Sequence, residues 1–231
     1  MRLASEELLD QGIGVDDPTA SDFVAAGAWG WDDMVPNLKA AAYPGAGEWA
    51  GVALPDHGEA WRLPWSVREH DGTSVSMECF GRLLPWSLTR RIELHPRAVR
   101  LTYTYRNRGR DPLYAYWCAH PLFRYESDMA VAGLPHVEPG TSRKVFLPPA
   151  AIDHVRLAWR SGTAVEVAWD PSLTRHAAIW VCDGDLGGYR QIAIEPATGA
   201  NDGPDLSEPP PLLGAGEELR WWLEIRDGRP A

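Results

Sequence analysis

The chain has 231 residues, of which 45% are hydrophobic and 23% are charged. These values are ordinary for a globular protein and fit one large β domain or two small ones. The formal net charge of −10 argues against nucleic acid or an anionic membrane as a partner. Twelve tryptophans are unusual, and they indicate a wide aromatic core, a carbohydrate-facing surface, or both.

The cysteines and the N-terminal sequence bear on the compartment. Cys79, Cys118 and Cys182 lack metal-like spacing, and their odd number and wide separation are typical of reduced thiols. The first residues contain no apolar core followed by a cleavage site, and no stretch reaches the length of a membrane span. We therefore expect a cytoplasmic protein.

Residues 1–27 are polar and rich in Gly, Ala and Asp, and we expect a poorly structured N-terminal segment. Gly and Pro bracket residues 27–37, which predicts an ordered loop. From residue 60 onward the pattern is that of short strands joined by turns. Strands are predicted at residues 60–65, 73–80, 87–94, 99–106, 144–147, 155–159, 164–169, 177–182, 190–195 and 218–226. No repeat or linker interrupts residues 28–231, so we expect one all-β domain of two antiparallel sheets.

The segment Asp56-His57-Gly58-Glu59 places a histidine between two carboxylates. Gly58 permits a sharp backbone path. One interpretation is a solvent-exposed polar turn. The other is a ligand site, because tryptophans follow at 61 and 65.

A second histidine, His120, follows an aromatic-rich run and precedes Pro121. We expect its strand to end there, because a proline restricts the residue before it. An imidazole flanked by aromatic surface suits a polar ligand with apolar faces, such as a sugar ring. The alternative is a histidine at a β-bend that binds only backbone groups.

The strand predicted at residues 190–195 has two distinct faces. Ile192 and Ile194 share one face, so that Gln191 and Glu195 share the other. Glu195 is predicted to end its strand, because the following proline cannot continue a central ladder.

His57-Gly58, His120-Pro121-Leu122-Phe123 and Glu195-Pro196 occur in this order, and together they resemble motifs of the galactose mutarotase-like family. That family includes aldose 1-epimerases and glucose-6-phosphate 1-epimerases. Residues 30–36 are similar to its Gly-Trp-Asp-Glu-x-x-Pro segment, residues 103–112 to its strand that ends in Asn before a Gly turn, and residues 214–217 to its final turn. The resemblance covers roughly residues 28–226.

The resemblance implies an antiparallel β-supersandwich, N-terminally shortened because the family's first strands and Gly-Gly turn are not found before residue 27. It implies an isomerase that interconverts the α and β anomers of a hexose or hexose derivative by opening the ring. Glu195 matches the family's general base, His120 its general acid, and His57 its second histidine, which holds the sugar. No metal and no cofactor is expected, since both steps are proton transfers.

The resemblance also suggests supporting residues. Asp56 or Glu59 is expected to orient His57. Trp31, Trp61 and Trp117 are candidates to stack on the sugar, with burial in the core as the alternative for each.

The expected partner is a small-molecule sugar, and the protein is expected to be a monomer or a homodimer. Asp-His-Gly-Glu replaces the His-Gly-Gly of galactose-type enzymes, so the sugar and its phosphorylation stay open. A catalytically silent carbohydrate-binding or sensing domain on the same fold is the alternative function. A purely structural β-sandwich is a third hypothesis.

Overall fold

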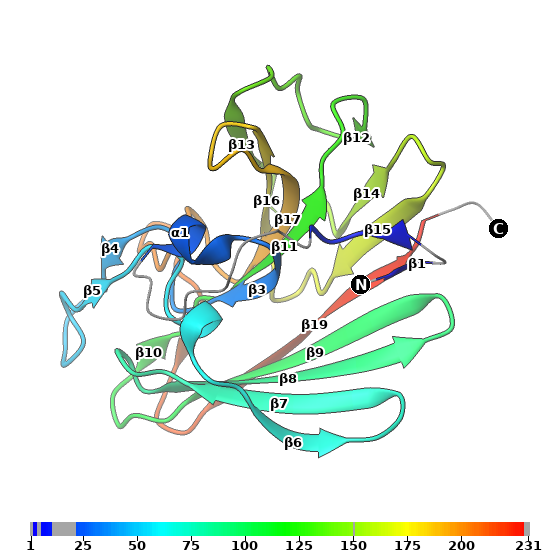
Figure 1. Ribbon diagram of the computed structural model, residues 1–231. Coiled ribbons are helices and arrows are strands. Elements are labelled where there is room, and N and C mark those ends of the chain that lie inside the picture. The colour runs from blue at the N-terminus through cyan, green and yellow to red at the C-terminus, as the bar shows by residue number, and fades with distance from the viewer. Residues whose placement is uncertain (1, 4–5, 11–21, 150, 229–231) are drawn as a thin grey trace.

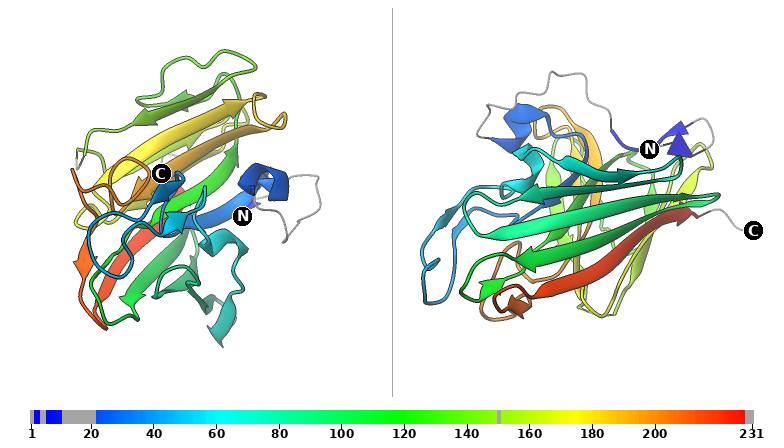
Figure 2. Two further views of the ribbon diagram at one scale, coloured as in Figure 1. Left: turned by 90° about the vertical axis from the view of Figure 1, so that its left-hand side faces the viewer. Right: turned by 90° about the horizontal axis from the view of Figure 1, so that it is seen from below.

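The computed structural model describes residues 2–3, 6–10, 22–149 and 151–228. Two antiparallel sheets face each other across a hydrophobic core (Figures 1 and 2). Most of the buried aromatic and aliphatic side chains belong to one cluster. The predicted all-β fold class of two antiparallel sheets is therefore confirmed. In the described residues, no helix has the length and apolar character needed to cross a membrane.

The smaller of the two sheets has five strands in the order β13-β16-β17-β11-β3. They are β3 (Gly30–Met34), β11 (Cys118–Arg124), β13 (Ser142–Phe146), β16 (His176–Asp183) and β17 (Arg190–Ala197). Strand β17 is the centre of this sheet and is buried along nearly its whole length.

The larger sheet has eight strands in the order β12-β14-β15-β19-β9-β8-β7-β6. They are β6 (Ser66–His70), β7 (Ser74–Phe80), β8 (Trp86–His95), β9 (Ala98–Asn107), β12 (Ala130–Val131), β14 (His154–Ala158), β15 (Ala164–Trp169) and β19 (Glu218–Asp227). Buried and exposed residues alternate along β9, β14 and β19, because one face covers the core and the other faces solvent.

Short elements complete the described chain. Three strand pairs are β1 (Arg2–Leu3) with β2 (Glu6–Glu7), β4 (Ala41–Ala42) with β5 (Ala53–Leu54), and β10 (Leu113–Tyr114) with β18 (Leu212–Leu213). Helix α1 (Phe23–Gly27) lies within residues 1–27, the segment expected to be poorly structured. Residues 1, 4–5 and 11–21 of this segment lie outside the described residues.

Two sequence predictions in this region are wrong. Residues 60–65 form a 3₁₀ turn, η1 (Ala60–Arg62), instead of a strand. The N–H groups of Arg62 and Leu63 bind carbonyls three residues earlier, which an extended chain cannot do. The loop predicted at residues 27–37 contains strand β3, which pairs with β11.

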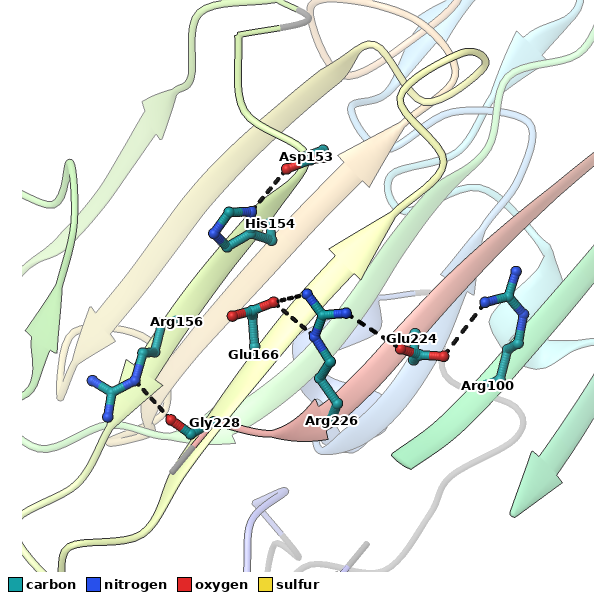
Figure 3. A network of polar contacts seen from close by, with 8 residues as sticks. All are labelled: Arg100, Asp153, His154, Arg156, Glu166, Glu224, Arg226 and Gly228. Carbon is teal, nitrogen blue, oxygen red and sulfur yellow. Dashed lines mark hydrogen bonds and ion pairs between the residues drawn. The ribbon is translucent and has the colours of Figure 1, made fainter. Parts of the chain in front are cut away.

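The outer face of the eight-stranded sheet carries a ladder of charged side chains (Figure 3). Arg226 on β19 donates to Glu166 on β15, and Arg100 on β9 donates to Glu224 on β19 at 3.4 Å. Cross-strand pairs of opposite charge favour this register, although exposed pairs contribute only about 0–1 kcal/mol each.

Candidate functional site

The candidate site lies on the face of the five-stranded sheet that points away from the core. His120 and Glu195 share this face with Gln191, as the alternation of β17 predicts. A pocket of about 240 Å³ opens over it. Its lining includes Phe23, His57, His120, Lys144, Glu195 and Asp202.

His120 and Glu195 are cross-strand neighbours. Pairing on both sides of them puts His120 on β11 opposite Glu195 on β17. The ladder between these two described strands is interrupted at this point, where Pro121 and Pro196 each lack an N–H. His120 Nε2 lies 3.6 Å from Glu195 Oε1, and both side chains are buried. The cross-strand register therefore places two titratable groups side by side.

The sequence predicted that these strands end at His120 and Glu195, and this prediction is wrong. Strand β11 continues through Pro121 to Arg124, and β17 continues through Pro196 to Ala197. Both prolines are tolerated because they lie where the β11–β17 ladder is already open, while each strand keeps its pairing with its other neighbour.

Lys144 and Asp202 complete a charged group around Glu195. Lys144 Nζ lies 2.6 Å from Glu195 Oε2 and 2.6 Å from Asp202 Oδ1. Burial raises the pKa of Glu195, and the Lys144 ammonium offsets part of that rise. Burial lowers the pKa of Lys144, but the two carboxylates outweigh it and raise that pKa above its ordinary value. Lys144 is therefore a permanent cation beside the carboxylate of Glu195.

His57 enters the pocket from the turn that follows β5. Gly58 in this turn has φ 64°, and a Cβ there would lie 2.4 Å from the carbonyl oxygen of Val35, so the turn requires glycine. His57 Nδ1 lies 2.6 Å from Asp56 Oδ2. Burial lowers the pKa of His57, and the Asp56 carboxylate raises it in part. Of the two carboxylates expected to orient this ring, Asp56 is the one that contacts it.

Of the two histidines in the pocket, His120 has the pKa that is lowered further. Burial lowers its pKa well below the ordinary value, and the nearby His57 and Lys144 lower it further. The two rings lie edge to face, with centroids 5.5 Å apart. His120 is therefore neutral near pH 7, with one ring nitrogen able to donate and the other able to accept.

Helix α1 brings an aromatic ring onto the histidines. Asp22 caps this helix by accepting a hydrogen bond from the Ala25 N–H at 2.9 Å. Phe23 in its first turn stacks on His57, with ring centroids 4.3 Å apart. Trp180 on β16 also lines the pocket, 6.0 Å from His120.

Several predicted sugar-binding residues do not reach the pocket. Trp117 is wrong as a stacking residue, because it is 0% exposed and packs against both Tyr103 and Trp221 in the core. Trp31 packs against the same core from β3, on the face opposite to His120.

Glu59 and Trp61 are also displaced from the pocket lining. The Glu59 carboxylate is buried and accepts hydrogen bonds from the N–H groups of Arg82 and Leu83 at 3.1–3.3 Å. It therefore stabilises the loop between β7 and β8. Trp61 does not line the pocket but packs edge-on against Phe23, which does, with ring centroids 5.4 Å apart.

The sequence analysis missed Lys144, Asp202, Phe23 and Trp180. One signal for Lys144 is present in the composition. The chain has two lysines, Lys39 and Lys144, among 22 basic residues, and both line the pocket. The other three reach the site only through tertiary packing.

Residues with a strained backbone lie at or beside the pocket. In the described residues, the non-glycine residues with positive φ are His57, Asn201 and Asp202. His57 and Asp202 line the pocket, and Asn201 is adjacent. Residues held in this unfavourable region are enriched at ligand sites.

The side chains of the pocket favour proton transfer. Across the described ranges, no group of three His, Cys, Asp or Glu side chains is arranged to hold a metal ion. Imidazole, carboxyl and ammonium groups around a partly aromatic pocket can bind hydroxyl groups and exchange protons with them.

Comparisons with known proteins agree with this architecture. No family model and no curated protein matches the sequence. A candidate aldose 1-epimerase from Escherichia coli K12 matches with a TM-score of 0.70 and 15% identity, over 88% of this chain and 84% of that chain. A galactose mutarotase-like protein from Lactobacillus casei ATCC 334 matches with a TM-score of 0.66 and 15% identity, over 85% and 84%. A galactose mutarotase related enzyme from Lactobacillus acidophilus matches with a TM-score of 0.61 and 13% identity, over 97% and 88%.

At such identities the likeness concerns the arrangement of the strands. It extends over most of this chain and of each matched structure. The protein therefore has the fold of the galactose mutarotase-like proteins.

Proposed function

We propose that the protein is an aldose 1-epimerase-like isomerase, which interconverts the α and β anomers of a hexose or hexose derivative. The observation that carries the proposal is the cross-strand pair of His120 and Glu195, 3.6 Å apart in a partly aromatic pocket. A pyranose has apolar faces and a polar edge, which suits such a pocket. Matched structures described as mutarotase-like support the same assignment.

In the proposed reaction, Glu195 accepts the proton of O1 while the protonated form of His120 donates a proton to the ring oxygen. This form is the minor one near pH 7, because burial lowers the pKa of His120. The bond between C1 and the ring oxygen breaks, and C1 becomes an aldehyde. Rotation about the C1–C2 bond presents the other face, and the reverse transfers close the ring. Since O1 and the ring oxygen are both bonded to C1, a neighbouring acid and base can serve both.

The residues around Glu195 and His120 would adjust the pKa of Glu195 and hold the sugar. The Lys144 ammonium lowers the pKa of Glu195 and so favours its carboxylate form against the effect of burial. His57, oriented by Asp56, would bind the sugar and polarise the ring oxygen.

A specific observation favours the alternative of a catalytically silent sugar-binding domain. Glu195 is in ion-pair contact with Lys144, and a carboxylate held by an ammonium is a weaker base. Binding of a sugar would have to draw the Glu195 carboxylate into contact with O1 for catalysis to occur.

Exchange NMR on the anomers of glucose, galactose and other aldoses separates the two functions. The proposal expects exchange faster than in buffer, and Glu195→Gln and His120→Ala each to remove about 10²–10⁴-fold of the acceleration. Glu166→Gln, on the outer face of the other sheet, is the matched carboxylate control (Figure 3). Sugar binding with exchange at the buffer rate would instead establish the silent domain.

A further inference from the structure

A second pocket adjoins the first. It has a volume of about 120 Å³, and Glu195 and Asp202 line both pockets. Its other walls include parts of β11, β13, β16 and the segment after β17, with Phe146, Asn201 and Glu208 among its residues. The carboxylate of Glu195 therefore lies in the wall between two compartments.

Phe146 gives this second pocket an aromatic surface. It is 55% exposed at the end of β13, whereas large apolar side chains in this protein are mostly buried. Phe146 shares a strand face with Lys144, whose Nζ lies 5.5 Å from the centre of the ring. An exposed ring at the mouth of a polar pocket can stack on the apolar face of a sugar.

The charge of the second pocket selects among ligands. Its described lining contains three carboxylates, Glu195, Asp202 and Glu208, together with His176, and no lysine or arginine. The Lys144 ammonium pairs with Glu195 and Asp202 and offsets one of these three negative charges. The balance at the second pocket stays negative, which disfavours a phosphate or carboxylate group there. Carboxylate and amide groups are well suited to bind the hydroxyl groups of an uncharged sugar.

The loop between the two pockets is held in a fixed shape. Asn201 and Asp202 have φ values of 55° and 64°, which are unfavourable for side-chain-bearing residues. The Asn201 amide donates to Asp205 at 2.8 Å, and Asp202 is held by Lys144. A strained backbone stabilised from both sides is typical of a preformed ligand site.

We propose that the second pocket binds an uncharged glycosyl unit joined to the sugar in the first pocket. The preferred substrate is then a reducing disaccharide or longer saccharide. This inference rests on the proposed function. The second sugar is attached at a carbon other than C1, because ring opening requires a free hydroxyl group on C1.

The test compares anomer exchange of glucose with that of sophorose, laminaribiose, cellobiose and gentiobiose, which differ in linkage position. At least one disaccharide should have a higher kcat/KM than glucose. Phe146→Ala should lower that disaccharide-to-glucose ratio about three- to tenfold, as expected for loss of one aromatic contact. Phe80→Ala removes another exposed ring, from the larger sheet, and should leave the ratio unchanged.

A binding measurement keeps this inference separate from the proposed function. In the Glu195→Gln variant, saturation-transfer NMR should show contact with both rings of the disaccharide, and Phe146→Ala should weaken the contact with the second ring. If glucose exchange is accelerated but every disaccharide is poorer and only one ring is contacted, the second subsite is refuted. If anomer exchange is accelerated for no aldose, the proposed function fails. The binding measurement then tests the subsite separately: contact with both rings supports it, and contact with one ring refutes it.

Discussion

Lys144 reaches Glu195 across an intervening strand, and their charged groups lie 2.6 Å apart. Lys144 on β13 pairs with Trp180 on β16, and Glu195 on β17 pairs with Ala178 on β16. Because Ala178 has a short side chain, the lysine can extend over it to the carboxylate. The site thus couples its proposed base to a fixed cation instead of leaving it as an isolated buried acid.

Replacing that cation should change the pH dependence of the reaction. Glu195 acts as a base only when it is deprotonated, so the low-pH limb of kcat/KM follows its pKa. Lys144 lowers that pKa, so Lys144→Met should raise it and move the limb to higher pH. The measurement is kcat/KM against pH by anomer-exchange NMR.

Lys144→Arg is the matched control, because it keeps the positive charge. Its low-pH limb should stay near that of the unmodified protein. A limb that is unchanged in Lys144→Met would show that Glu195 does not set it.

Trp117 illustrates how strand alternation separates core residues from site residues. It lies three positions before His120, and an odd separation along an extended chain places two side chains on opposite faces. Trp117 Nε1 donates to Asp33 Oδ1 at 2.9 Å, and Asp33 is itself buried beside Arg90. The aromatic run around His120 therefore contributes mainly to the core.

Trp117→Phe should accordingly destabilise the protein without acting on the sugar directly. The substitution removes the hydrogen bond to the buried Asp33 Oδ1. The free energy of unfolding, measured by urea titration, should therefore fall by about 1–3 kcal/mol. Trp222→Phe is the control, since that ring lies on the outer face beneath Arg100 and should change stability by less than about 0.5 kcal/mol. Equal losses in both variants would contradict the buried role of Trp117.

The fold was largely predictable where strands separate an apolar face from a polar face. Strand β15 coincides with its prediction, β8 and β9 are longer than predicted by one residue at each end, and β19 is longer by one residue at its C-terminal end. Strand β6 was missed because all of its residues are exposed at the edge of the sheet, so no apolar alternation marks it. The 3₁₀ turn η1 was mistaken for a strand because local apolar residues do not distinguish the two.

The candidate site was predictable only in part. His57, His120 and Glu195 were identified by resemblance, and the structure brings them into one pocket. Phe23 was missed because it arrives from a helix within the polar N-terminal segment. Asp202 was missed because its place beside Lys144 depends on a loop and a strand far apart in sequence.

The Asp56–His57 pair offers a second kinetic test. The Asp56 carboxylate raises the pKa of His57 and fixes the orientation of its ring. Asp56→Asn keeps an acceptor oxygen but removes the charge, so the pKa of His57 should fall further. The protonated fraction of His57 at neutral pH then decreases, and kcat/KM should fall roughly tenfold or more.

The structure contains a matched pair for comparison. Asp153 and His154 are also adjacent in sequence, and His154 Nδ1 lies 2.8 Å from Asp153 Oδ1 on the outer face of the other sheet (Figure 3). Asp153→Asn should leave kcat/KM unchanged. Equal effects of the two substitutions would mean that the Asp56–His57 contact has no role at the site.

The scarcity of lysine permits a chemical test of the site's electrostatics. Reductive methylation modifies neutral amines, and its extent at Lys39 and Lys144 can be followed separately by peptide mass spectrometry. Lys39 is exposed and should react readily, whereas two carboxylates hold the pKa of Lys144 above its ordinary value and keep it protonated. In Glu195→Gln one of these carboxylates is lost, the pKa of Lys144 should fall, and its methylation should accelerate while Lys39 serves as the internal control. A Lys144 that reacts as fast as Lys39 in the unmodified protein would contradict the ion pair with Glu195 and Asp202.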